Sequence, residues 1–284
     1  MKISVIITVY NRFQYVENIL KCLLKQTITP YEVIFTDDGS KENLRDILDK
    51  YKSECNFKIK HIYQKDIGFR KSKACNNAFI ETSGDYIISL DQDAIFPNDL
   101  IEKFVKLSKQ GYYSILRVIW STYEEMEKIQ KMIDDNRNYE DYLEPLNKNQ
   151  FKKLKKWLFK DKYNNMRYFL KMRDRGAGLM GIGFGVFKED IIKINGYDED
   201  FKGWGGEDAD LGFRLYYLGL KSKTFSTKLA SIHMCHPFDP TKSKDDNNKK
   251  QENKKKQETL NGKIKSYYGI NNRKDKDTYK VEVI

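Results

Sequence analysis

Two aspartates, Asp91 and Asp93, stand one residue apart at the end of the hydrophobic stretch GDYIISLDQDAIF. In an extended chain, side chains two residues apart point the same way, so both carboxylates can approach one cation or the ribose and phosphates beside it. Carboxylate oxygens are the ligands that hard divalent cations prefer. An Asp-x-Asp pair is common on loops, but its place after a strand-like segment favours a metal or nucleotide site.

Two of the three histidines follow late in the chain, in IHMCHP. His233 and His236 are three residues apart, and imidazole nitrogens bind manganese and similar ions alongside carboxylate oxygens. Beside a turn-forming proline the pair is equally compatible with an incidental role, and it is the two aspartates that favour the metal interpretation. The third histidine, His61, lies in an alternating strand pattern and is interpreted as structural.

A further group of acids begins a predicted helix in GWGGEDADLGFRL. Acids are favoured in a first helical turn because they cap free N–H groups and meet the positive end of the helix dipole. The pattern alone therefore fits a helix start as well as a catalytic or metal site. Asp210 is interpreted as a capping or structural acid, whereas Glu207 and Asp208 are candidates for chemistry. Trp204 lies beside glycines that let a ligand approach, and is either a sugar-stacking or a packed aromatic residue.

The first hundred residues alternate between strand and helix patterns and predict an α/β fold. Strands are expected in ISVIITVY, YEVIFTDDGS, FKIKHIYQ and DYIISLDQDAIF, and helices in YVENILKCLLKQ, ENLRDILDKYK and KSKACNNAFIET. Strands joined by helical crossovers predict a mostly parallel sheet with helices on both faces. Ligands bind beyond the carboxyl ends of such strands, where Tyr10 to Arg12, Asp37 to Gly39 and Asp91 to Asp93 fall.

Two basic segments accompany this pattern. Residues 1–240 form the predicted main domain, residues 119–175 a basic helical insertion within it, and residues 241–284 a basic C-terminal extension. The run NQFKKLKKWLFKDKYNNMRYFLKMRDR is either an amphipathic helix for an anionic membrane surface or a helix packed on its own domain with solvated lysines. The run TKSKDDNNKKQENKKK predicts a flexible or solvated extension.

The composition is typical of a soluble globular protein with an anionic partner. The chain has 284 residues, 39% of them hydrophobic, and a net charge of +11, which suits a phosphorylated substrate, a nucleic acid or an anionic membrane. No apolar run approaches the roughly 20 residues of a spanning helix, and the first residues predict a strand and not a signal peptide. A cytoplasmic location is therefore expected, with the four scattered cysteines as free thiols.

Six motifs in this order resemble those of the family 2 glycosyltransferases, which have the Rossmann-like GT-A fold. The motifs are SVIITVYNR, FTDDGS, DIGFRKSKACNNAF, GDYIISLDQDAIF, GWGGEDADLGFRL and IHMCHP. The second half is similar to the carboxyl-terminal region of β-1,4-galactosyltransferases and of chondroitin-type polymerases. The resemblance covers residues 1–118 and 176–240 and leaves the insertion and the extension uncovered.

The resemblance implies a role for each motif. It implies that the donor, a UDP-sugar, is bound by Thr8, Tyr10, Arg12, Asp38, Arg70 and Asp91. Asp38 would contact the nucleobase, and Arg70 would lie near the phosphates. It implies a divalent metal, Mn²⁺ before Mg²⁺, bound by Asp93, His236 and His233. It also implies Asp208 as the catalytic base and Glu207, with Trp204, as acceptor-binding residues. The chain departs from the family at Cys75, where an arginine is usual.

The expected activity is an inverting, metal-dependent transfer of a hexose or N-acetylhexosamine from a UDP-sugar to a hydroxyl group. The acceptor is a glycan or a lipid-linked glycan, the product linkage is β, and the motifs leave the donor sugar open. A basic nucleic-acid-binding protein is the first alternative, but acids at three strand ends would repel a phosphate backbone, so no nucleic-acid partner is expected. A nucleotidyltransferase is the second, but TVYNRFQYVEN lacks its glycine- and lysine-rich loop. Peripheral binding to the inner face of the membrane is compatible with the basic insertion.

Overall fold

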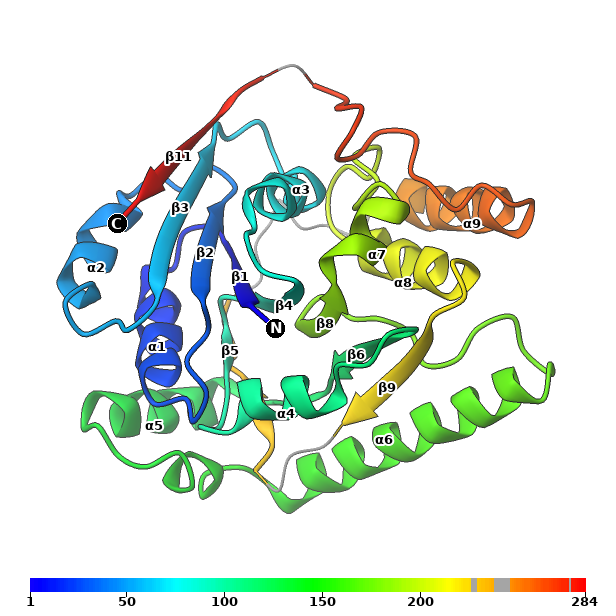
Figure 1. Ribbon diagram of the computed structural model, residues 1–284. Helices are drawn as coiled ribbons and strands as arrows, with labels where there is room; N and C mark the ends of the chain where they lie inside the picture. Colours follow the sequence, from blue (N-terminus) through cyan, green and yellow to red (C-terminus); the bar gives the residue numbers. More distant parts are fainter. Residues whose placement is uncertain (226–228, 238–245, 276) are drawn as a thin grey trace.

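The computed structural model describes residues 1–225, 229–237, 246–275 and 277–284 (Figure 1). Its centre is an eight-stranded sheet, made of β1 (Ile3–Val9), β2 (Glu32–Asp37), β3 (Lys58–Gln64), β4 (Tyr86–Asp91), β6 (Tyr112–Leu116), β8 (Gly183–Phe187), β9 (Lys221–Phe225) and β11 (Tyr279–Val283). The strands lie in the order β11-β3-β2-β1-β4-β8-β6-β9. The predicted α/β class is confirmed.

The first four strands are parallel, as the alternating pattern predicts. β1 pairs in parallel with both β2 and β4, and β2 pairs in parallel with β3. Three helices make the crossovers: α1 (Phe13–Leu24), α2 (Leu44–Tyr51) and α3 (Lys71–Glu81). β8 and β11 run antiparallel to their neighbours, so the sheet is mixed towards its two edges. The carboxyl ends of β1, β2 and β4 meet at one edge, which positions the acids that follow them.

Alternation along the central strands divides the core between the two faces of the sheet. In β1, Val5 and Ile7 belong to one hydrophobic cluster and Ile6 to the other, and all three side chains are fully buried. The first cluster includes side chains of α1, α2 and α4 (Leu100–Leu107), and the second those of α3, α7 (Lys188–Lys193) and α8 (Glu207–Tyr217). A strand covered on both faces is apolar at most positions, which explains the nearly continuous hydrophobic run ISVIITV.

A second, three-stranded sheet joins distant parts of the chain. It contains β5 (Ala94–Ile95), β7 (Val118–Trp120) and β10 (Ser231–His233), in the order β5-β10-β7. His233 pairs with Ala94 across β5 and with Trp120 across β7. This pairing brings the late histidine motif next to the Asp-x-Asp motif, which lies some 140 residues earlier in the sequence.

The predicted basic insertion is helical. It contains α5 (Tyr123–Asp134), the short 3-10 helix η1 (Asp141–Leu143) and the long α6 (Lys148–Phe169), which crosses the lower part of Figure 1. Thr122 and Asn147 begin α5 and α6 with capping boxes, in which the side chains of Glu125 and Gln150 reach back to the cap N–H groups. Within the described residues, no helix has both the length and the apolar character to cross a membrane.

The C-terminal extension, predicted to be flexible or solvated, is in its described part largely solvated but contains regular secondary structure. Residues Asp246–Leu260 form α9, which lies along α8 in Figure 1, and β11 adds to the sheet edge beside β3. Lys255 of α9 forms an ion pair with buried Asp198 at 2.6 Å. Polar helices of this kind gain their stability from such tertiary contacts, which composition does not reveal. The predicted boundary between residues 240 and 241 lies outside the described residues.

Candidate active site

The adjacent ends of β1 and β4 place Asp91 beside Thr8. Thr8 and Asp91 are direct partners in the sheet register, and the Thr8 hydroxyl donates to Asp91 Oδ1 at 2.8 Å. The next residue along, Gln92, fixes the turn that follows β1, since its amide donates to the Tyr10 carbonyl and accepts from the Tyr10 N–H. The middle residue of Asp-x-Asp, which the sequence presents as a spacer, therefore joins the two strand ends.

The turn between β1 and α1 is held in an unusual backbone conformation. Asn11 and Arg12 both have positive φ, at 52° and 54°, which is uncommon for residues other than glycine. The Ser40 hydroxyl accepts from the Asn11 N–H at 2.7 Å and so fixes this turn against the end of β2. Such conformations persist where surrounding contacts enforce them, and they are concentrated at functional sites.

A small cavity of about 80 Å³ lies at this edge of the sheet. Five of the six predicted donor residues line it, together with Trp204, Gln92 and Lys71: they are Thr8, Tyr10, Arg12, Asp38 and Asp91. Burial raises the pKa of Asp38 to about 6, against the lowering effect of hydrogen bonds from the Arg70 N–H and the Gln64 amide. The structure thus brings together most of the predicted donor set.

Arg70 is the exception, because its side chain lies away from this cavity. Its guanidinium forms ion pairs with Asp277 at 2.9 Å and with Asp275 at 3.6 Å, in the segment before β11. Only the backbone N–H of Arg70 reaches the predicted site, where it donates to Asp38. The sequence could not show this, since the acidic partners lie about 200 residues further along the chain.

The neighbouring Lys71, which was not among the predicted site residues, brings a second cation to the site beside Arg12. Its ammonium lies 2.8 Å from Asp91 Oδ1 and 3.7 Å from Asp208 Oδ2, and its side chain is only 14% exposed. Burial lowers the pKa of Lys71, but the Asp208 and Asp91 carboxylates outweigh it and hold the pKa well above its usual range. A lysine that begins a helix directly after a glycine- and arginine-containing loop was the available signal.

Asp93, His233 and His236 form a cluster with the geometry of a metal site. One ligand atom of each residue lies within 4.8 Å of the others. Asp93 Oδ2 is 3.1 Å from His236 Nε2, and Asp93 Oδ1 is 3.5 Å from His233 Nε2. The three residues that the sequence analysis assigned to a metal are therefore together.

The donor set of this cluster fits a divalent transition ion. His236 Nδ1 lies 3.0 Å from the Pro237 carbonyl, which requires a proton on Nδ1 and leaves Nε2 facing the Asp93 carboxylate. A lone pair facing a carboxylate is favourable only with a cation between them, either a proton or a metal. Burial lowers the pKa of His233, opposed by Asp93, and so favours the neutral imidazole that binds metals.

The expectation that Asp91 and Asp93 face one cation needs correction. The chain turns at residues 92 and 93 instead of continuing as a strand, so the two carboxylates diverge. Asp93 faces the histidines, and Asp91 faces Lys71 and Thr8. Burial raises the pKa of Asp91, with Lys71 opposing and Asp93 adding to the rise. Within the described residues, the metal-site cluster does not include Asp91.

Glu207 and Asp208 begin α8, and their surroundings differ. Glu207 is buried and accepts a hydrogen bond from the Gly205 N–H at 3.0 Å. Burial raises its pKa to about 7, with Asp208 adding to the rise and Lys71 opposing it. Asp208 accepts from the Tyr197 hydroxyl at 2.7 Å and keeps 21% of its side chain exposed. Asp208 is therefore oriented by a buried tyrosine and still accessible.

Asp210, the third acid of this motif, has a structural role as expected. Its carboxylate pairs with Arg214 one turn later at 2.7 Å, and both side chains are buried. Arg214 also donates to the carbonyls of Ile194 and Gly196. These contacts hold α8 to the loop before it. Asp210 does not line the cavity that Glu207 and Asp208 face.

A cavity of about 580 Å³ joins the acids, the histidine cluster and two tryptophans. Its walls include Asp91, Asp93, Lys71, Trp120, Trp204, Glu207, Asp208, His233 and His236. Trp204 is 40% exposed and lines both this cavity and the smaller one, which makes the two spaces neighbours. The arrangement offers a donor space and an acceptor space on either side of the Asp91–Lys71 pair.

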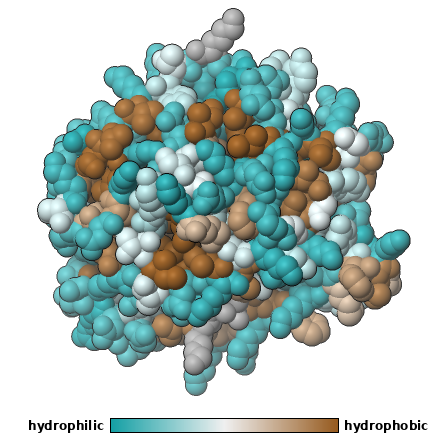
Figure 2. Space-filling model, in the orientation of Figure 1, coloured by the Kyte–Doolittle hydropathy of each residue, from teal (hydrophilic) through white to brown (hydrophobic). Residues whose placement is uncertain are grey.

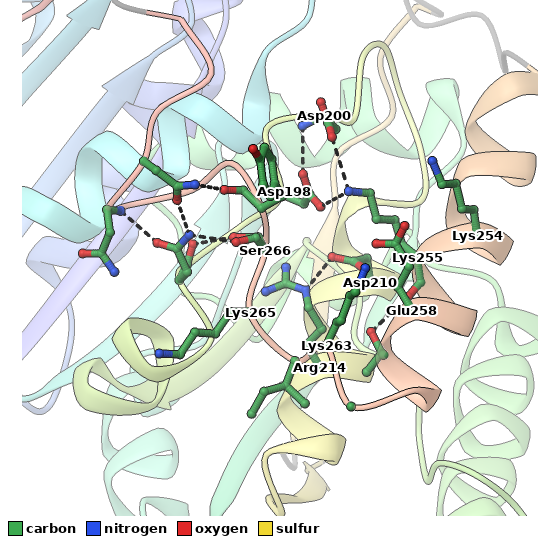
Figure 3. Close-up of a pocket in the computed structure, with 17 residues that line it drawn as sticks. Asp198, Asp200, Asp210, Arg214, Lys254, Lys255, Glu258, Lys263, Lys265 and Ser266 are labelled. Atoms are coloured by element: carbon green, nitrogen blue, oxygen red, sulfur yellow. Dashed lines mark hydrogen bonds and ion pairs between the residues drawn. The ribbon is translucent and has the colours of Figure 1, made fainter.

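A larger cavity, of about 960 Å³, lies between α8, α9 and the segment after α9 (Figure 3). It contains none of the predicted site residues. Its buried charges neutralise one another, as the dashed lines between Asp210 and Arg214 and between Asp198 and Lys255 show. We therefore assign the chemistry to the two cavities at the strand ends.

Comparisons with known proteins agree with this geometry. Residues 4–189 match the family described as glycosyl transferase family 2, and residues 162–237 match the N-terminal domain of galactosyltransferase. The chain is 27% identical to a chondroitin synthase of Escherichia coli, over 94% of this chain and 39% of that protein. It is 25% identical to a validoxylamine A glucosyltransferase of Streptomyces hygroscopicus subsp. limoneus, over 77% of this chain and 48% of that protein. It thus spans less than half the length of either relative.

Solved structures share the fold at low sequence identity. A mannosyltransferase from Pyrobaculum calidifontis, in complex with GDP-Man and Mn²⁺, superposes with a TM-score of 0.54 at 14% identity, over 82% of this chain and 56% of that one. S. aureus TarS in complex with UDP-GlcNAc superposes with a TM-score of 0.54 at 16% identity, over 86% of this chain and 62% of that one. The sheet, the strand-end site and the family match lead to one conclusion: the chain belongs to glycosyl transferase family 2 and is a glycosyltransferase of GT-A fold.

Proposed function

We propose that this glycosyltransferase moves a hexose or N-acetylhexosamine from a UDP-sugar to a hydroxyl group of a glycan or lipid-linked acceptor, with metal dependence and inversion to a β-linkage. The observation that carries the proposal is the shared cavity, in which Asp208, the Asp93 cluster and Trp204 face one space next to the donor residues. The polysaccharide synthases among its relatives favour a glycan acceptor. TarS with UDP-GlcNAc supports a UDP-sugar donor.

The donor residues have distinct tasks in this proposal. Asp38 accepts a hydrogen bond from the nucleobase in the small cavity, which Thr8, Tyr10 and Arg12 also line. Asp91 is oriented by Thr8 and Lys71 to bind the ribose. Asp93, His233 and His236 would hold Mn²⁺, or Mg²⁺, which when bound stabilises the charge on the leaving diphosphate. We assign no phosphate contact to the Arg70 side chain.

Asp208 is the proposed base. A base must take the proton of the acceptor hydroxyl as that oxygen attacks, and an accessible carboxylate with one oxygen still available suits this task. Tyr197 occupies Oδ1, which leaves Oδ2 towards the cavity and Lys71. Glu207 binds the acceptor, and Trp204 stacks on its ring. A single displacement of this kind inverts the anomeric centre, so an α-linked donor gives a β-linked product.

A panel of nucleotide sugars tests the proposal. Thermal shifts are measured with UDP-Glc, UDP-Gal, UDP-GlcNAc, UDP-GalNAc and GDP-mannose, each with and without Mn²⁺, and the transfer product is examined by proton NMR. We expect stabilisation by at least one UDP-sugar only with metal, and a β-anomeric coupling in the product. A response to GDP-mannose alone, an α-linkage, or synthesis of a UDP-sugar from UTP would each contradict it.

The proposed location is the cytoplasmic side of a membrane, with peripheral attachment to anionic lipids. The support is the basic composition of the insertion, which contains α6. The residues that would make this contact are identified in the next subsection.

A further inference from the structure

One face of α6 is fastened to the domain. Leu154, Asp161 and Asn164 are its buried residues. Asp161 accepts two hydrogen bonds from the Arg117 guanidinium, at 2.7 and 3.1 Å, and both side chains are almost completely buried. Because these positions recur at helical spacing, they define one inner side of the helix, which contacts β7 and β9.

The opposite face of α6 carries large apolar side chains in solvent. Phe159, Tyr163, Met166 and Leu170 are spaced by four, three and four residues, so they form a row along the helix, roughly opposite the inner side. Phe169, the last residue of α6, and Met172, just beyond the helix, are exposed beside the end of this row. We call these six residues the outer stripe; their exposed fractions are 71% for Phe159, 47% for Tyr163, 50% for Met166, 75% for Phe169, 53% for Leu170 and 61% for Met172.

Cations surround the outer stripe. The helix contains seven lysines and one arginine against a single acid, and that acid is the buried Asp161. In Figure 2, brown and tan side chains protrude at the lower right among hydrophilic teal ones, where Figure 1 places the end of α6. An apolar row flanked by lysines is the pattern of a helix that lies in a membrane interface, with its ammonium groups at the lipid headgroups.

We propose that the outer stripe and its lysines dock the enzyme on an anionic membrane. The stripe enters the boundary between headgroups and acyl chains, and the lysines contact lipid phosphates. A second copy of the chain is a poor partner, because two such faces would bring eight cations against eight. A nucleic acid would use the lysines but would leave Met166, Phe169 and Leu170 in water.

The position of α6 connects this surface with the site. The helix begins beside Trp120, whose carbonyl accepts a hydrogen bond from Gln150 at 2.8 Å, and Trp120 lines the 580 Å³ cavity. Docking through α6 would therefore hold the cavity at the membrane surface, where a lipid-linked acceptor is found. This last step rests on the proposed function, whereas the docking itself does not.

Vesicle flotation with the full chain, without donor or acceptor, tests the docking. The vesicles are phosphatidylcholine alone, or equal parts phosphatidylcholine and phosphatidylglycerol. The test variant carries F159S and F169S, and the control carries I192S and V283S, two exposed apolar residues distant from α6 in the sequence. We expect binding to the anionic vesicles only, about tenfold weaker in the test variant and unchanged in the control.

A second variant, K152E with K155E, should lose binding to the anionic vesicles as well, and added salt should weaken binding of the unmodified chain. Thermal unfolding of each variant and sugar transfer to an acceptor in solution verify that the fold and the site are intact. Equal binding of the F159S/F169S variant and the unmodified chain would overturn the proposal. So would a dimer in light scattering that this variant abolishes, or binding to RNA in preference to vesicles.

Discussion

Lys71 lies between the two acids on which the proposed chemistry depends. It is the cation within 4 Å of both Asp91 and Asp208. A Cβ atom at Gly181 would come within 2.3 Å of Asp208 Oδ2 and 2.5 Å of Lys71 Nζ, so a side chain there would displace the ends of both. Lys71 is thus a positioning residue, which lies between two carboxylates and opposes the rise that burial gives the pKa of Asp91.

Replacing Lys71 with methionine should shift the pH dependence of transfer. Without the ammonium, which opposes the effect of burial on Asp91, the pKa of Asp91 rises further, so the acidic limb of kcat/KM moves to higher pH. K71R should restore the position of the limb in part. The pH profile distinguishes this role from a structural one, since a merely destabilised protein would lose activity at all pH values alike.

Asp208→Asn should remove the base and keep the geometry. The asparagine carbonyl still accepts from the Tyr197 hydroxyl, so the donor and metal should bind as before. Transfer should fall about 10²- to 10⁴-fold, the usual contribution of general acid–base catalysis. Single-turnover kinetics with E189Q, an exposed acid on α7, as the control would measure this. Substantial turnover by the D208N variant would assign the base elsewhere.

Glu207→Gln should change how stability depends on pH. The pKa of Glu207 in the folded chain is raised to about 7, above its usual 4.5. Its favourable contribution to the free energy of unfolding is therefore complete below pH 4.5 and is lost as the pH rises through 7. The variant does not lose this contribution. Its free energy of unfolding, relative to that of the unmodified chain, should therefore rise by on the order of 2 kcal/mol from pH 4.5 to pH 8. Urea unfolding of both metal-free proteins over this pH range gives the difference; a constant difference would contradict the assignment.

At the scale of elements, the long α6 depends on one buried ion pair. Asp161→Ala leaves the Arg117 guanidinium buried without its carboxylate, which should cost about 3–5 kcal/mol of unfolding free energy. The double variant R117M/D161L should recover most of this loss, because no uncompensated charge remains. The matched control K160A, next to Asp161 on the exposed side, should change stability little. Urea unfolding at neutral pH measures all three.

The sequence predicted the elements of the first hundred residues well, and the later ones less well. Nearly continuous apolar runs predict β1, β2 and β4, because these strands are buried on both faces, and an alternating run predicts β3. The antiparallel direction of β8 and the edge strand β11 are set by pairing with strands far away in sequence. Four of the five residues of β11 are exposed, and two of these are Lys280 and Glu282, so its pattern resembles a solvated tail. Its place on the edge came only from the tertiary structure.

At the scale of the whole molecule, two segments about 140 residues apart in the sequence make the metal cluster. Mn²⁺ should raise the stability of the intact chain, by about 2.7 kcal/mol at a metal concentration one hundred times Kd. H236A should abolish this gain, and H61A, in the histidine that faces Asp37 and not the cluster, should keep it. Calorimetric titration with Mn²⁺ measures both. Binding should weaken as the pH is lowered, because protons compete with the metal for its ligands.

The sequence by itself determined the family, the parallel half of the sheet and most of the residues proposed for the site. These follow from local patterns: strand ends fix where Thr8, Asp38 and Asp91 go, and helix starts fix Glu207 and Asp208. Only the tertiary structure decided which charges meet. It sends Arg70 to Asp277, brings Lys71 between Asp91 and Asp208, and separates Asp93 from Asp91. Ion pairs and metal clusters depend on distances between segments far apart in the chain, which no local pattern specifies.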